Sequence, residues 1–182
     1  MMTGISLRRS PLRATASVLA TVLVCSCALA PGADSSLSAV KGRIEGVYSL
    51  EEWHLGAEAV RAPRVDGRFM LKDGAVITIL HNRVQETSQM TVASYGSYLL
   101  DATRFSYRYD DTSVFVQTGA GITVSRKLPW DGMRAFAVLS EGSSVRLRSD
   151  NGLQEFLFTP EVLTYSENGK LQRVWRRIAE RK

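Results

Sequence analysis

The chain has 182 residues and a formal net charge of +5, and this length suits one domain with a hydrophobic core of ordinary size. Arg8, Arg9 and Arg13 lie in an N-terminal leader without acidic residues, and subtracting their three charges from +5 leaves +2. This balance excludes the strongly basic surface of a nucleic-acid-binding protein. Both cysteines, Cys25 and Cys27, also lie in the leader, which excludes a disulfide, a thiolate metal site and a cysteine nucleophile in the rest of the chain.

Residues 1–27 are predicted to be a signal peptide. A basic segment precedes the apolar run 14–24, which is shorter than the roughly 20 residues of a membrane-spanning helix and has the length of a signal-peptide core. Two processing sites remain open: residues 28–30 have the small-x-small form but precede a proline, whereas residues 24–27 resemble a bacterial lipobox with Cys27 as the lipidated residue. We expect an exported protein, either a periplasmic or outer-membrane lipoprotein anchored only through Cys27, or alternatively a secreted protein.

The composition divides the rest of the chain into three parts. Residues 28–43 begin with small and polar residues, which predict a flexible spacer. The folded domain is expected over 44–178, and 179–182 form a basic tail. A solvated last strand and tail is a better interpretation than an anion-binding patch for the basic cluster near the C-terminus, which comprises Arg173, Arg176, Arg177, Arg181 and Lys182.

The first half of the domain is organised around a hairpin. An alternating strand is predicted over 44–50, followed by a long loop over 54–66. Residues 67–80 contain two β-rich runs around Asp73-Gly74, a dipeptide suited to the positive φ angles of a tight hairpin turn. Residues 81–94 are polar and poor in β-forming types, which predicts a short helix or an irregular connection.

The second half repeats short strands and tight turns. Strands are predicted over 95–100 and 103–109, and the latter alternates aromatic with polar residues. Residues 119–132 are rich in turn formers, and further short strands follow to 175. About ten short strands with a turn every 8–12 residues or so are typical of an all-β sandwich or barrel. Sequential hairpins favour a single antiparallel up-and-down β-barrel, because a closed meander leaves few edges to protect.

Several short motifs along 44–178 share residues and spacing with one family. They are Gly46-x-Tyr48-x-Leu50, Gly67-Arg68-Phe69 through Asp73-Gly74, Tyr95-Gly96-x-Tyr98 ending at Asp101, Pro129-Trp130-x-Gly132 followed by Arg134-x-Phe136, and Val174-Trp175-Arg176-Arg177. In these motifs the chain resembles the bacterial lipocalin-like domain family, a branch of the calycin barrels, with Tyr48 replacing the family's opening Trp. The resemblance implies a barrel whose cup holds a small apolar molecule, and it implies no shared catalytic residues. It also implies that Tyr48 and Trp175 pack at the closed end, with an arginine of the last strand over the ring.

Aromatic residues and one arginine form the candidate binding site. As core residues the aromatic side chains would fill the barrel, whereas as site residues they would line a cavity. Tyr107 and Tyr109 are the best cavity candidates because their face alternates against arginines. Arg134 could pair with the carboxylate headgroup of a fatty-acid-like ligand or face solvent. The candidate ligand-binding residues are Trp53, His81, Tyr98, Phe105, Tyr107, Tyr109, Trp130 and Arg134.

The chain shows no catalytic or cofactor motif. No Ser-His-Asp order, glycine-rich phosphate loop or paired carboxylates stand out, so no catalytic residue and no cofactor are predicted. His54 and His81 are the two histidines, and no spacing with Glu51 or Glu52 supports a metal site. His81 could exchange a proton in the cup if its strand faced inward; otherwise it would be a solvent-exposed histidine at a strand end.

Three functions follow as hypotheses. The first is a non-enzymatic protein that binds or carries a small hydrophobic molecule in the barrel, and it is favoured by the aromatic face and the family resemblance. The second is a structural or interaction lipoprotein of the cell envelope with a filled barrel. The third is a barrel isomerase or cyclase that uses Tyr107 or His81 as acid or base. The sequence leaves open whether the barrel is hollow, because inward aromatic residues fill a small barrel as readily as they line one.

Overall fold

The computed structural model describes residues 33–127 and 129–179. The predicted signal peptide, the processing sites and the lipidation candidate Cys27 lie outside the described residues, as do the first part of the spacer and residues 180–182. Among the described residues, no helix is both long enough and apolar enough to cross a membrane.

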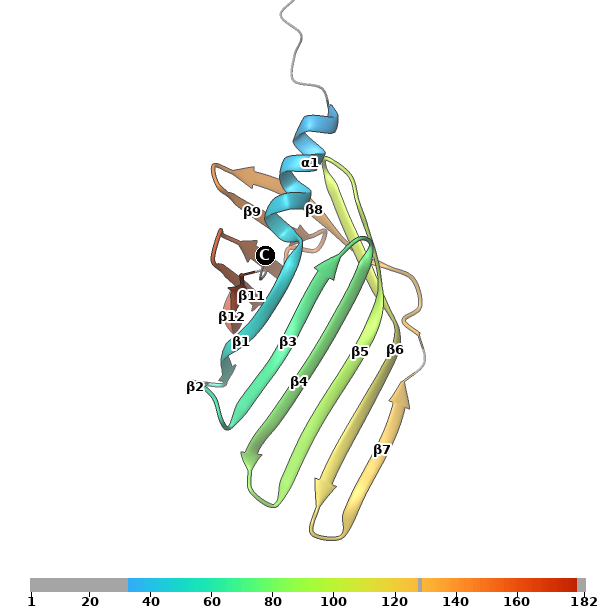
Figure 1. The fold of residues 1–182 in the computed structure, drawn as a ribbon, viewed down its shortest axis with the longest axis vertical. Coiled ribbons are helices and arrows are strands. Elements are labelled where there is room, and N and C mark those ends of the chain that lie inside the picture. The colour runs from blue at the N-terminus through green and yellow to red at the C-terminus, as the bar shows by residue number, and fades with distance from the viewer. Residues whose placement is uncertain (1–32, 128, 180–182) are drawn as a thin grey trace, which may run out of the picture. The chain divides into compact units, whose positions relative to one another are not determined.

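The described chain forms one helix followed by antiparallel strands (Figure 1). In chain order they are α1 (Ala33–Ile44), β1 (Gly46–Leu55), β2 (Glu58–Val60), β3 (Val65–Lys72), β4 (Ala75–Gln85), β5 (Ser88–Leu100), β6 (Arg104–Thr118), β7 (Gly121–Lys127), β8 (Arg134–Glu141), β9 (Ser144–Ser149), β10 (Gln154–Phe158), β11 (Val162–Glu167) and β12 (Lys170–Ile178).

Ten of the strands close into an antiparallel barrel. Each pairs with its neighbours in the order β1, β3, β4, β5, β6, β8, β9, β10, β11 and β12, and β12 pairs with β1 to complete the ring. In that last ladder Val47 lies opposite Ile178, and Trp53 lies opposite Arg173. Strands β2 and β7 lie outside the ring, paired to β1 and β6. The predicted all-β, up-and-down barrel is therefore confirmed.

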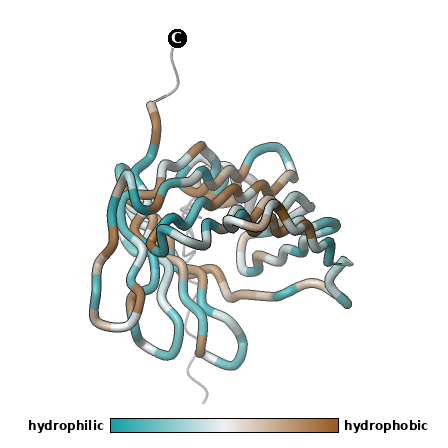
Figure 2. The backbone as a smooth tube through the Cα atoms, turned by 90° about the horizontal axis from the view of Figure 1, so that it is seen from below, coloured by the Kyte–Doolittle hydropathy of each residue, from teal (hydrophilic) through white to brown (hydrophobic). Residues whose placement is uncertain are grey.

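The alternating pattern of the sequence sets which side chains face the interior. In β3, Phe69 and Leu71 are buried while the residues between and after them are more exposed, as the period of two in a strand requires. Figure 2 shows hydrophobic and hydrophilic residues following one another along the strands. The turn after β3 has positive φ angles at Asp73 (48°) and Gly74 (83°), which confirms the predicted hairpin.

A bulge in β5 and β6 lets these long strands belong both to the ring and to an extension beyond it. The register shifts between Tyr95 and Gly96, where a Cβ atom on Gly96 would lie 2.0 Å from the carbonyl oxygen of Arg108. Glycine is therefore required there by the close approach of the two backbones. Beyond the bulge, β6 leaves β8 and pairs with β7.

Helix α1 occupies most of the segment that the composition predicts as a flexible spacer. Val40 and Ile44, on one face of the helix, are buried in the barrel core, and Leu37, three residues before Val40, lies on the same face. The helix forms because the barrel buries this stripe, whereas small and polar residues dominate the local composition. Figure 1 shows α1 at the end of the barrel where β1 begins.

Three segments predicted as loops or helix are strands in the structure. Residues 81–94 continue β4 to Gln85 and begin β5 at Ser88, residues 119–132 contain β7, and residues 54–66 contain β2. The polar composition of 81–94 arises because one face of these strands is exposed, so that polar side chains alternate with inward apolar ones. Polarity thus marks an outward strand face here rather than a break in the sheet.

Candidate ligand-binding site

The barrel is hollow in the half that lies away from α1. A cavity of about 190 Å³ occupies this half, beside Arg173, which pairs with Trp53 at the far end of β1 from the helix. The cavity is bounded by inward side chains from several strands and by one residue between β7 and β8. These are Phe69, Thr78, Leu80, Val92, Ser94, Tyr107, Tyr109, Trp130, Arg134, Phe156, Leu163, Tyr165, Arg173 and Trp175.

The half of the barrel next to α1 is filled. Tyr48, Phe136 and Phe158 are fully buried there. Between this layer and the cavity only a void of about 10 Å³ remains, which is the size of one water molecule at most. The barrel is therefore filled at the end next to α1 and hollow at the opposite end.

Arg177 fixes the closed end. Its Nη2 donates hydrogen bonds to the carbonyl oxygens of Arg43 (2.5 Å) and Glu45 (2.7 Å) and to the hydroxyl of Tyr48 (2.9 Å). Its guanidinium lies 5.4 Å from the centre of the Tyr48 ring. This is the arginine-over-aromatic arrangement that the family resemblance implies for the last strand, and it joins α1, β1 and β12.

Trp130 brings the β7–β8 connection into the cavity wall. Its backbone N–H donates to the carbonyl oxygen of Tyr109 (3.1 Å). Its ring lies edge-on to Tyr109, with ring centres 4.9 Å apart, and 5.4 Å from Tyr107. The guanidinium carbon of Arg134 lies 3.8 Å from the centre of the indole ring. Trp130 and Arg134 therefore form a stacked pair at the edge of the cavity, with Arg134 exposed to solvent.

Arg173 lies within the cavity wall between two rings. Its guanidinium carbon is 4.7 Å from the centre of Trp53 and 5.7 Å from that of Tyr165. Its Nε is buried and has no hydrogen-bond partner. Among the described residues, no carboxylate forms an ion pair with Arg173 or with Arg134. Burial lowers the pKa of Arg173, because the charged form loses hydration.

The hydroxyl groups of the cavity remain protonated at neutral pH. Burial raises the pKa values of Tyr107, Tyr109 and Tyr165 above their usual range. Tyr109 and Thr78 share a hydrogen bond of 2.5 Å between their hydroxyl oxygens. Among the described residues that line the cavity there is no aspartate or glutamate. Its charge at neutral pH therefore comes from two guanidinium groups.

The structure brings four of the eight sequence-predicted residues together in the cavity wall. They are Tyr107, Tyr109, Trp130 and Arg134. Phe105 lies next to them in the filled layer, with its ring centre 5.9 Å from that of Tyr107. Phe105, Tyr107 and Tyr109 come from β6 and Arg134 from the start of β8, which pairs with β6, whereas Trp130 lies in the connection between β7 and β8.

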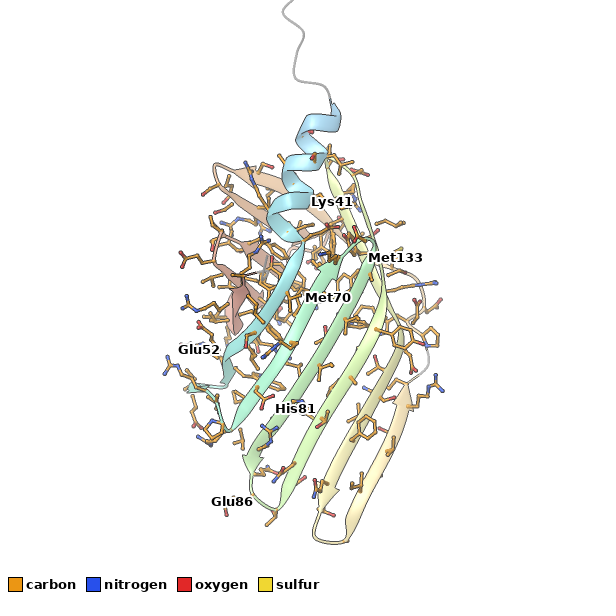
Figure 3. All side chains as sticks on the ribbon, in the orientation of Figure 1. Lys41, Glu52, Met70, His81, Glu86 and Met133 are labelled. Carbon is orange, nitrogen blue, oxygen red and sulfur yellow. The ribbon has the colours of Figure 1, made fainter. Side chains whose placement is uncertain are left out.

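The other three predicted residues lie elsewhere. Trp53 is absent from the described cavity lining, and its ring contacts the guanidinium of Arg173. Tyr98 lies at the closed end, where its hydroxyl donates to Glu45 and where burial and this carboxylate raise its pKa. His81 is not in the cavity wall: its Nδ1 is 2.9 Å from the Thr91 hydroxyl. Figure 3 shows His81 on β4, away from α1.

The most informative residue that sequence reasoning missed is Arg173. It belongs to the basic cluster predicted to be solvated, yet it alternates with Trp175 and Arg177, and all three point inward. Arg176, one position out of phase, faces outward, where it pairs with Glu51 (2.5 Å). The period of two that includes the aromatic Trp175 is the signal that could have distinguished the inward arginines from the outward one.

The two histidines lie in separate polar clusters. His54 Nε2 is 3.1 Å from a carboxylate oxygen of Glu52, and His81 Nε2 is 3.8 Å from Asp66. Figure 3 shows Glu52 and His81 at different places on the barrel wall. In the part of the chain that the structure describes, no three His, Cys, Asp or Glu side chains are grouped to hold a metal ion.

No protein-family model, curated protein or solved structure matches the chain. The fold and the site are therefore described on their own geometry. That geometry is a closed antiparallel barrel of ten strands, consistent with a calycin-like barrel.

Proposed function

We propose that this chain is an exported, lipocalin-like protein that binds a small, largely apolar molecule in its barrel. The observation that carries the proposal is the cavity of about 190 Å³ in a barrel whose other half is filled. A protein that works only through its surface has no need of such a void, because unfilled space in a core costs stability.

The dimensions and the lining of the cavity support a small ligand. Dry apolar cavities of roughly 150 Å³ bind benzene, whereas pockets for drug-sized ligands measure about 300–1,000 Å³. The lining combines aromatic and aliphatic side chains with the hydroxyl groups of three tyrosines, Thr78 and Ser94 and with two guanidinium groups, and such polar groups orient a ligand in a small-molecule site. The expected occupant therefore has one or two rings or a short aliphatic chain.

The chemistry of the cavity favours binding over proton transfer. Tyr107 keeps its proton at neutral pH because burial raises its pKa, so it can donate a hydrogen bond but is a poor general base. His81, the other residue considered for acid–base chemistry, lies outside the cavity wall. Export and a lipid anchor at Cys27 remain part of the proposal on the sequence pattern of the leader.

The test is direct binding to the full chain. We would titrate a panel of one- and two-ring aromatic molecules and medium-chain fatty acids, following native mass spectra and tryptophan fluorescence, since Trp130 and Trp175 line the cavity. At least one compound should bind with 1:1 stoichiometry and quench the fluorescence.

A matched pair of variants locates the site. Val92 and Ala93 are neighbours in β5, and only Val92 lines the cavity. Val92→Phe should therefore fill the cavity and weaken binding about tenfold or more, a loss of roughly 1.4 kcal/mol, whereas Ala93→Phe should not. The absence of 1:1 binding across the panel would contradict the proposal and favour a protein that works through its surface. Equal weakening by both variants would show that the ligand does not bind in the cavity.

A further inference from the structure

We infer that the ligand of this barrel is a small aromatic carboxylate whose headgroup is bound by Arg173, with Arg134 assisting at the edge of the cavity. The inference rests on the proposed function and specifies the chemistry of the ligand. It follows from how the cavity arginines are placed, which differs from the placement of arginines on the outer wall.

Among the described residues, most outer arginines have an acidic partner and the two cavity arginines have none, although the exposed Arg68 and Arg148 also form no ion pair. Eight other arginines form ion pairs with carboxylates, and these are Arg61, Arg64, Arg83, Arg104, Arg108, Arg126, Arg146 and Arg176. In contrast, no carboxylate of the described residues pairs with Arg134 or Arg173. Glu167 acts on Arg173 only at longer range, and it accepts a hydrogen bond from Gln154 (3.3 Å).

The contacts of Arg173 leave its hydrogen-bond donors free. Trp53 and Tyr165 contact the guanidinium through their rings. Such contacts stabilise the positive charge, but they do not accept hydrogen bonds from the N–H groups in the guanidinium plane. The Nε of Arg173 is buried without a hydrogen-bond partner. A buried donor of a charged group that stays unpaired costs free energy. A carboxylate in the cavity would compensate the buried positive charge of the guanidinium group.

A carboxylate fits this arrangement better than a neutral acceptor. Its two oxygens match the planar fork of a guanidinium, and the hydrogen bonds are charge-assisted. Within the part of the chain that the structure describes, the cavity wall has no acidic side chain that would repel an anion. The protonated hydroxyls of Tyr107 and Tyr165 supply further donors. A single headgroup can therefore be neutralised while it stays inside the barrel.

The remainder of the cavity favours an aromatic body. Seven of its lining side chains are aromatic, namely Phe69, Tyr107, Tyr109, Trp130, Phe156, Tyr165 and Trp175. Aromatic rings gain from offset and edge-on packing against one another beyond the area that they bury. With about 190 Å³ available, one or two rings fit and a long acyl chain does not.

The experiment compares two probes of the same shape, 2-naphthoate and 2-naphthamide, by calorimetric titration of the full chain at neutral pH. We expect naphthoate to bind about tenfold tighter or more, because charge-assisted hydrogen bonds are worth about 1.5–3 kcal/mol. Equal affinities would overturn the carboxylate assignment while leaving the proposed function intact. If neither probe binds, the proposed function itself fails for two-ring ligands, and the inference fails with it.

Variants then test which arginine binds the carboxylate headgroup. Arg173→Gln should remove most of the preference for naphthoate and leave the affinity for naphthamide within about threefold of the wild type. Arg134→Gln should reduce the preference less, because Arg134 is exposed and its charge is screened. Arg176→Gln, in the outward residue of the same strand, is the control and should leave both affinities unchanged.

The assignment does not depend on one variant folding. Circular dichroism and thermal melting would establish that each variant keeps the barrel. Should Arg173→Gln fail to fold, Arg173→Lys keeps the charge but loses the fork, and it should bind naphthoate more weakly with naphthamide unaffected. A full naphthoate preference that survives in both Arg134→Gln and the folded Arg173 variant would overturn the inference.

Discussion

Arg176 and Arg177 are neighbours in β12 whose side chains point to opposite faces of the barrel wall. Arg177 reaches inward and donates to two carbonyl oxygens and to the Tyr48 hydroxyl. Arg176 reaches outward to Glu51, with its side chain 55% exposed. The same residue type therefore has a structural role in one position and a surface role in the next.

We predict that Arg177→Gln lowers the free energy of unfolding by about 2–4 kcal/mol, because it leaves buried carbonyl oxygens without donors. Arg176→Gln should cost less than about 1 kcal/mol, as is usual for an exposed ion pair. Urea denaturation followed by circular dichroism measures both. Equal costs for the two substitutions would show that the closed end does not depend on Arg177.

The cavity depends on the same alternation. Arg173, Trp175 and Arg177 follow one another at intervals of two, so the positions that face inward in β12 are readable from sequence once the strand is recognised. The basic cluster obscures that pattern. Charged side chains are expected to face solvent, whereas the alternation predicts that these positions face the interior. At Arg173 the side chain faces the interior, where its guanidinium contacts the rings of Trp53 and Tyr165.

At the scale of elements, β5 and β6 are joined by a contact that admits only glycine. A Cβ on Gly96 would lie 2.0 Å from the Arg108 carbonyl oxygen and 2.7 Å from the Tyr109 Cα. Both are backbone atoms, so neither can move without disturbing the ladder of β6. The bulge at this point places Tyr109 in the cavity wall and lets the strands continue beyond the ring.

Gly96→Ala should therefore destabilise the protein by about 2 kcal/mol or more, in line with overpacking of a close contact. Gly42→Ala is the matched control: no atom lies within 4 Å of a Cβ on Gly42, and alanine in a helix should add about 0.5–1 kcal/mol. Thermal unfolding of the two variants should therefore shift in opposite directions. A stable Gly96→Ala variant would mean that the two strands do not approach so closely.

Helix α1 shows why composition alone misjudges an element. Its apolar residues are few, and the small residues around them are typical of a linker. The helix is nevertheless positioned by Val40 and Ile44, which enter the core, and by the hydrogen bonds from Arg177 to the backbone at its end. Tertiary burial supplies most of the stability of such a short helix.

At the scale of the whole molecule, several buried tyrosines couple stability to pH. Burial raises the pKa values of all five beyond that of an exposed tyrosine, and the neighbouring Glu45 adds to the effect at Tyr98. They are Tyr48, Tyr98, Tyr107, Tyr109 and Tyr165. The folded state therefore holds these protons more tightly than the unfolded state does.

We predict that the free energy of unfolding does not depend on these tyrosines below about pH 10, the pKa of an exposed tyrosine, and falls as the pH rises above it. The unfolded chain then releases protons that the folded chain retains. Urea denaturation across this range measures the decline. Tyr107→Phe should make the decline shallower, and a decline that begins equally steeply in that variant would contradict the assignment of Tyr107 as a buried, protonated hydroxyl.

The sequence determined the all-β class, the central hairpin and the barrel, because alternation with a period of two and glycine turns are local properties that survive in any environment. It also singled out Tyr107, Tyr109, Trp130 and Arg134, which the structure places together in the cavity wall. The tertiary structure alone decided that one half of the barrel is filled and the other hollow. Void volume depends on how side chains from strands far apart in the chain meet, and so does the placement of Arg173, which faces the cavity without an ion pair to any acidic side chain of the described residues.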